Sequence, residues 1–176
     1  TAKLGSNAVS SAKMFSGFSN GITMVDQFRL TANITTPDGQ LTSNLERVDD
    51  ATFGSIGTGM TNSSGIFTFP QTGIYLIMVQ AGISYPNVAD NQSNVFTKVS
   101  SDSGSNFEDA GRAAAGSNSS SNNSFFTVFS QSFVDVTNIS TFQVKFNCTS
   151  FASGVELVGD TNMSITSFSF IRLGDT

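Results

Sequence analysis

Three acidic groups are the densest places in this sequence where side chains could do chemistry: Asp49 with Asp50, Asp102, and Glu108 with Asp109. Two neighbouring carboxylates can act as a general acid and a general base when burial separates their pKa values. Each of these groups lies in a polar, turn-like segment that lacks the apolar neighbours needed for such burial. We therefore expect solvated loop charge at these positions and no catalytic site.

Two short segments alternate oxygen-bearing side chains in the way that hard cations prefer: residues 90–94 (DNQSN) and residues 102–106 (DSGSN). Neither continues to the terminal Glu of a full calcium-binding loop, and Gly57-x-Gly59 does not continue as a dinucleotide-binding fingerprint. We predict no metal ion and no other cofactor, with calcium at the apex of an assembly as the alternative.

The composition excludes further classes of site. The chain has no His, which removes the commonest metal ligand and general base, and its single Cys148 has no partner for an intrachain disulfide. Eight Lys and Arg against thirteen Asp and Glu give a net charge of −5, which argues against nucleic-acid binding. No apolar run approaches the ~18 residues of a membrane span, and the N-terminus shows no secretory signal. The sequence therefore predicts a protein that is not an enzyme and does not insert into membranes.

The elements that must position any site are strands. From residue 22 onward, runs rich in β-branched and aromatic residues alternate with turns rich in Gly, Asn, Asp and Pro, and no segment has a convincing helical pattern. Eight to ten strands fit a two-sheet antiparallel sandwich or jelly roll. We predict one all-β domain over residues 22–176, preceded by an N-terminal arm over residues 1–21 that is flexible or docks onto another chain.

The predicted strands differ in how many apolar faces they have. Residues 141–149 alternate cleanly, with one apolar and one polar face. Residues 74–85 and 125–136, in contrast, carry large apolar side chains on both faces. A strand of an antiparallel sandwich needs only one dry face, so the second apolar face predicts a cover from outside the fold, most simply another copy of the chain.

The sequence resembles the trimeric jelly rolls of the complement globular-head and tumour necrosis factor (TNF) group. Residues 65–77 (GIFTFPQTGIYLI) are similar to that group's strand, Pro-x-x-Gly turn and Gly-x-Tyr-x-aliphatic strand, and residues 163–173 (MSITSFSFIRL) are similar to its last strand. The resemblance implies a homotrimer in which Tyr75, Ile77 and Val79 point into the sandwich. It implies that Leu76, Met78 and Gln80 face the threefold axis. The chain departs from the group in lacking a collagen-like stalk, a membrane anchor and any Trp.

The surface composition, rich in Ser, Thr, Asn and Phe and poor in Cys, also resembles jelly-roll virion proteins of tailed bacteriophages, particularly the short ones of marine phages. This resemblance implies a virion surface protein that binds a host glycan or protein at a fibre tip. The alternatives are a capsid-decoration or tail-assembly protein and, less favoured, a secreted recognition module outside viruses. The loops over residues 86–94 and 101–124 are the candidate receptor contacts, with Asn87, Asp90, Asn94, Asp102, Asn118, Asn122 and Asn123. The arm residues Met14, Phe15 and Phe18 are the candidate contacts to other virion proteins.

Overall fold

The structure of the chain is a computed structural model that describes residues 21–176. These residues form thirteen strands and no helix, so the described part also has no helix long and apolar enough to cross a membrane. Six of the strands have only two or three residues, which is why the sequence pattern predicts fewer. The strands are β1 (Met24–Leu30), β2 (Ile34–Thr35), β3 (Gly39–Gln40), β4 (Leu45–Arg47), β5 (Thr61–Ser63), β6 (Ile66–Thr68), β7 (Gly73–Tyr85), β8 (Asp90–Ser100), β9 (Glu108–Ser117), β10 (Ser124–Val136), β11 (Gln143–Thr149), β12 (Glu156–Leu157) and β13 (Ser167–Gly174).

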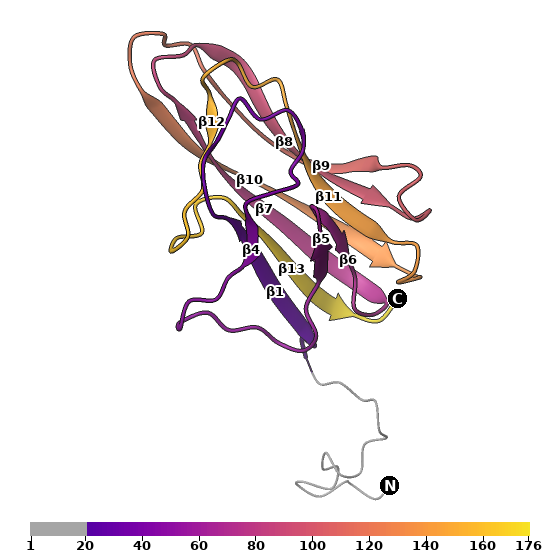
Figure 1. The fold of residues 1–176 in the computed structure, drawn as a ribbon. Helices are drawn as coiled ribbons and strands as arrows, with labels where there is room; N and C mark the ends of the chain where they lie inside the picture. Colours follow the sequence, from indigo (N-terminus) through magenta and orange to yellow (C-terminus); the bar gives the residue numbers. More distant parts are fainter. Residues whose placement is uncertain (1–20) are drawn as a thin grey trace, which may run out of the picture.

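Two antiparallel sheets pack face to face, which confirms the predicted all-β sandwich (Figure 1). In the first sheet, the long strand β7 pairs with β10 on one side and with β13 and β12 on the other, and β1 and β4 continue beyond β13. In the second sheet, β11 pairs with β8 on one side and with β6 and β3 on the other, and β9 and β5 form the edges. The outer face of each sheet is thus free to carry a site.

The core lies between the sheets and follows the two-residue period of each strand. Tyr75, Ile77 and Val79 of β7 are fully buried, as the sequence predicts. Phe67 lies at the centre of an aromatic group, with its ring centroid 5.0 Å from that of Phe28 and 5.3 Å from that of Phe170. Burial raises the pKa of the core thiol of Cys148 to about 12, which keeps it protonated and unreactive.

Strand β9 is the one long strand that sequence reasoning missed. Its residues, EDAGRAAAGS, include no β-branched or aromatic side chain, so the sequence predicts a loop over residues 101–124. Small residues are needed because β9 closely approaches β10 at the edge of the sandwich. The Ser132 hydroxyl donates to the Ala110 carbonyl at 2.8 Å, and a Cβ on Gly111 would meet that same hydroxyl. The prediction of one continuous loop is therefore wrong.

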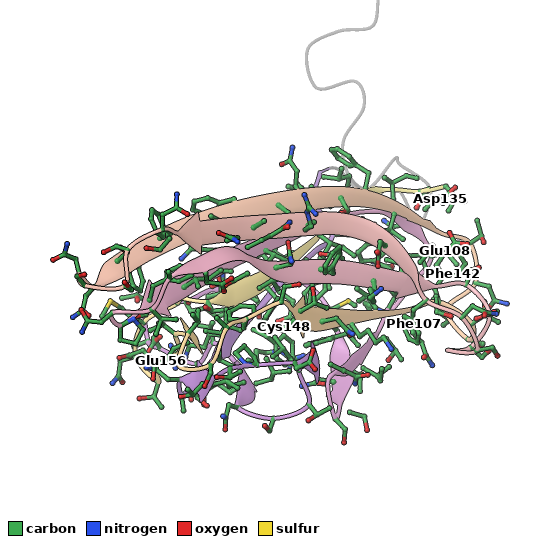
Figure 2. The ribbon with its side chains drawn as sticks, turned by 90° about the horizontal axis from the view of Figure 1, so that it is seen from above. Phe107, Glu108, Asp135, Phe142, Cys148 and Glu156 are labelled. Carbon is green, nitrogen blue, oxygen red and sulfur yellow. The ribbon has the colours of Figure 1, made fainter. Side chains whose placement is uncertain are left out.

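The strand registers define two ends of the molecule. At the first, which we call the loop end, Tyr85 pairs with Ser124 and Asp90 with Ser117, so the loops over residues 86–89 and 118–123 lie together. At the other, which we call the terminal end, Met24 pairs with Arg172, so the first described residues adjoin the C-terminus. Residues 101–107 also lie there. Figure 2 shows Phe107, Glu108 and Asp135 grouped near the terminal end and Glu156 toward the loop end.

Candidate functional site

The outer face of the first sheet carries an exposed stripe of aromatic side chains. Phe125, Phe129 and Phe133 recur on one face of β10 and have exposed fractions of 53%, 67% and 66%. Monomeric surfaces rarely gather large apolar residues in this way, so a contiguous apolar patch marks an interaction site. With Leu76 and Met78 of β7, these residues form what we call the phenylalanine face.

The register of the first sheet places Leu76 and Met78 alongside this stripe. Leu76 lies between Phe133 and Ile171, while Met78 lies between Gln131 and Ser169. Both side chains are half-buried and face away from the core. The structure thus brings two of the predicted interface residues onto the phenylalanine face, although it tests no contact between copies of the chain.

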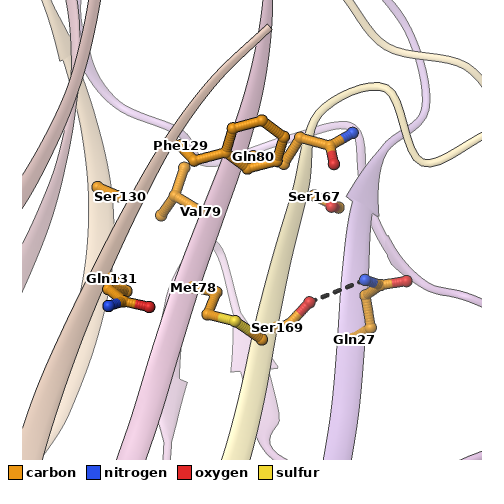
Figure 3. A pocket seen from close by; sticks show the side chains of 9 residues that line it. All are labelled: Gln27, Met78, Val79, Gln80, Phe129, Ser130, Gln131, Ser167 and Ser169. Carbon is orange, nitrogen blue, oxygen red and sulfur yellow. Dashed lines mark hydrogen bonds between the residues drawn. The ribbon is translucent and has the colours of Figure 1, made fainter.

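A shallow hollow of about 370 Å³ opens beside Met78 on this face (Figure 3). Phe129 and Gln131 of β10 line one side of it, and Gln27 lines the other. The Gln27 amide donates to the Ser169 hydroxyl at 2.8 Å, so this polar pair is already satisfied within the chain. The hollow therefore offers an apolar side chain the surfaces of Met78 and Phe129, and the Ser130 hydroxyl in its lining has no hydrogen-bond partner among the described residues.

Gln80, the third predicted interface residue, is engaged within its own chain. Its amide nitrogen donates to the carbonyl oxygens of Ser164 at 2.7 Å and Ile165 at 3.1 Å. These bonds hold the segment before β13 against the outer face of β7. Gln80 is therefore less available to a partner than the neighbouring Phe129, which stands opposite it and which the predicted interface omitted.

The candidate receptor residues fall at both ends of the molecule. The side chains of Asn87, Asn118, Asn122 and Asn123 are exposed at the loop end, where they form one polar surface. Asn87 also has a φ of 56°, a backbone region that Asn adopts more readily than most residues. Asp102 lies at the terminal end, on the far side of β9. Residues 101–124 therefore do not form one contact surface.

Two candidate receptor residues of the predicted loop over residues 86–94, Asp90 and Asn94, belong to strand β8. Asn94 is only 4% exposed, so its prediction as a receptor contact is wrong: its amide is held between Gln92 and Thr149. Asp90 accepts hydrogen bonds from Ser93, Gln92 and the backbone N–H of Ala152. Burial raises the pKa of Asp90, but the hydrogen bonds outweigh it and leave the pKa below its usual value. Its role is to tie β8 to the loop over residues 150–155.

Asp102 organises the turn between β8 and β9. Its carboxylate accepts the backbone N–H of Asn106 at 2.9 Å, the Asn106 amide at 2.7 Å and the Ser100 hydroxyl at 2.7 Å. These bonds, led by the Asn106 N–H, lower the pKa of Asp102 to about 2. The oxygens that could have held a cation are thus used by the turn itself.

Replacing Asp102 with Ala is expected to lower the melting temperature at pH 7 and to have less effect in acid. The folded-state pKa of about 2 lies below the usual value of 3.8, so the charged carboxylate stabilises the fold above pH 3.8. That contribution fades as the pH falls toward 2. Melting curves of the wild type and D102A should therefore converge between pH 4 and pH 2. A constant difference across that range would contradict this role of the carboxylate.

Several other acidic side chains pair with cations, although Glu108 forms no ion pair with any described residue. Glu46, Asp49 and Asp50 surround the guanidinium of Arg29, which is 1% exposed, and Asp109 pairs with Lys98. The Arg29 cluster is thus more ordered than the solvated charge predicted from sequence. Among residues 21–176, no three His, Cys, Asp or Glu side chains lie close enough together to hold a metal ion. The candidate arm contacts Met14, Phe15 and Phe18 lie outside the described residues.

Comparisons with known proteins identify the fold. No protein-family model matches the sequence, and neither does any curated protein. Among solved structures, the chain is similar to Eiger TNF from S. frugiperda, with a TM-score of 0.65 and 13% identity over 89% of this chain and 96% of that one. It is also similar to murine APRIL, with a TM-score of 0.57 and 14% identity over 85% of this chain and 98% of that one. With its two antiparallel sheets and these structural neighbours, the chain has the TNF-like jelly-roll fold.

Proposed function

We propose that this chain is a non-enzymatic homotrimeric recognition module, and that it serves on the virion surface of a tailed bacteriophage. The observation that carries the trimer is the phenylalanine face, because three large rings on one strand face gain most of their stabilisation only when another surface covers them. Obligate interfaces resemble a protein core cut in half and typically bury more than ~2,000 Å². The TNF-like fold supports a second copy of the same chain as that cover.

The test of the trimer is its molar mass in solution. Light scattering after size exclusion should give three times the chain mass at micromolar concentration and should not change on moderate dilution. A well-folded monomer would overturn the proposal. A dimer would also do so, because only one of the three proposed interfaces would then form.

The placement of the arm and the loops at opposite ends of the domain supports the more specific proposal of host recognition. The chain enters at the terminal end, where the arm over residues 1–21 connects, and Asn87, Asn118 and Asn122 lie at the opposite end. A module attached through its arm would thus present the loop end outward. Exposed amides and hydroxyls suit hydrogen bonding to a glycan or a protein surface, and loops tolerate change without disturbing the core.

Shortening the loop over residues 118–123 is expected to weaken host-cell binding and leave melting nearly unchanged. Ser117 and Ser124 already face each other, with their hydroxyls 3.2 Å apart. Deleting residues 119–122 leaves Asn118 and Asn123 to join β9 to β10 across this short gap. Flow cytometry of labelled protein on host cells checks the binding, and calorimetry checks the fold. The matched control is deletion of residues 1–20, which should spare cell binding but prevent incorporation into particles.

Structural decoration of the capsid or tail is the second candidate function. It predicts the reverse pattern, in which the loop deletion leaves cell binding untouched and the arm deletion alone frees the protein from virions. Antibodies against the recombinant protein should label intact phage particles under either role. Labelling of infected-cell lysate without labelling of particles would remove the virion proposal and leave a recognition module of another source.

A further inference from the structure

The Lys and Arg side chains of the described residues are neutralised by carboxylates more completely on the first sheet than on the second. Arg29, Arg47 and Arg172, on strands of the first sheet, all form ion pairs with Asp or Glu. The remaining three, Lys98, Arg112 and Lys145, lie on the second sheet. The strand alternation places all three on its outer face, because Thr97, Ala113 and Val144 beside them are buried.

These three cations are grouped around aromatic rings. Arg112 stands opposite Phe96 in the register of β9 with β8, and the Lys98 ammonium lies 5.6 Å from the Phe96 ring centroid. The Lys145 ammonium lies 3.9 Å from the ring centroid of Phe107. We call this group the basic aromatic face; it consists of Phe96, Lys98, Phe107, Arg112 and Lys145.

The arrangement is unfavourable for the isolated chain. Lys98 and Lys145 are direct cross-strand partners, and like charges in that position destabilise a sheet. Among the described strand residues on this face, Asp109 is the one carboxylate that offsets them, and neither Arg112 nor Lys145 forms an ion pair with any described residue. Among the described residues, the two cations without an ion pair, Arg112 and Lys145, thus lie on one face of a chain whose net charge is −5. An anionic ligand would relieve this repulsion.

We propose that the basic aromatic face binds an anionic polysaccharide, one that bears carboxylate or sulfate groups. The half-exposed rings offer apolar surface to the C–H face of a sugar, and the cations offer charge-assisted hydrogen bonds to its acidic groups. Neutral polar side chains flank the rings, and the amide oxygen of Asn147, next to Phe96 across β11 and β8, has no partner among the described residues. The face has only three cations and the protein has a net negative charge. Such a surface is better suited to a sparsely charged sugar chain than to the closely spaced phosphates of nucleic acid.

Four immobilised probes test this proposal with the full chain: polygalacturonate for carboxylate, dextran sulfate for sulfate, unmodified dextran for a neutral sugar, and single-stranded DNA for a polyanion without sugar acids. Biolayer interferometry should show binding to at least one anionic sugar that weakens with salt, and no binding to dextran. R112Q and K145Q should each weaken that binding roughly tenfold or more, because each variant loses a charge-assisted hydrogen bond to an acidic group of the sugar. Phe96→Leu should weaken it while leaving the fold intact.

The matched control is Ser55→Asp, which makes the same change in net charge at an exposed loop position away from this face. It should leave binding unchanged. Equal weakening by S55D would show a response to total charge and overturn the site, and so would DNA binding as tight as sugar binding. Absence of binding to both anionic sugars also overturns it. The face is separate from the phenylalanine face and from the loop end, so this inference and the proposed function can fail independently.

Discussion

Lysine in place of Phe129 is expected to give a folded monomer in place of the proposed trimer. Phe129 is the most exposed of the three rings on β10, and on that face it adjoins Gln80 and the hollow beside Met78. An ammonium group left unpaired in a subunit interface typically costs about 3–5 kcal/mol, and the loss recurs at each of three interfaces. The monomer itself should lose little, because the side chain is already in solvent there. Light scattering and circular dichroism separate the two effects.

Two further variants, one on the phenylalanine face and one on the opposite sheet, test where the interface lies. Met78→Lys, in the middle of the same face, should also prevent assembly. Lys145→Glu should leave the trimer intact, because Lys145 lies on the outer face of the opposite sheet, away from the phenylalanine face. If sedimentation shows F129K, M78K and K145E to be equally trimeric, the phenylalanine face is not the interface between copies.

The sequence predicts this face well because its signal is local. A strand alternates its faces with a period of two, so apolar residues at both parities in residues 74–85 and 125–136 already indicate two buried faces. The structure adds which face is which, since Tyr75 and Val134 fill the core and leave Leu76 and Phe133 outside. The prediction of interface residues nevertheless omitted β10, because the strand pairing that brings β10 beside β7 joins residues about 50 positions apart.

The loops are less predictable because their position depends on register and not on composition. Apart from Phe107, residues 101–124 are polar, small or charged and have the composition of one long loop. In the fold, β9 crosses the whole length of the sandwich within that range and separates Asp102 from Asn118. Asn94 illustrates the same limit: it ends the polar run over residues 90–94, yet pairing with Thr149 of β11 buries it. The Gln80 amide donates to the carbonyl oxygens of Ser164 and Ile165, which are more than 80 positions away in the sequence, so no local pattern predicts this contact.

Replacing Gly65 with Ala is expected to destabilise the fold strongly, whereas the same change at Gly39 should have a modest effect. Ser64 and Gly65 form the two-residue turn between β5 and β6, with φ of 49° and 80°, as a type I′ hairpin requires. A Cβ on Gly65 would also lie well inside van der Waals contact of the Leu41 carbonyl oxygen. The turn therefore cannot accept a side chain without moving the backbone before β4.

Gly39 is a close control because its φ is 79° and a Cβ there would meet no atom within 4 Å. The stability lost in G39A thus measures only the cost of holding a residue with a side chain in the left-handed backbone region, about 1–2 kcal/mol. Overpacking adds about 1–3 kcal/mol at Gly65, so G65A should lose roughly 2–5 kcal/mol in total. Urea unfolding at pH 7 measures both variants. Equal losses in the free energy of unfolding would mean that the backbone at Leu41 moves aside without cost. Gly65 would then be needed for its positive φ and not for the close approach of two backbone segments.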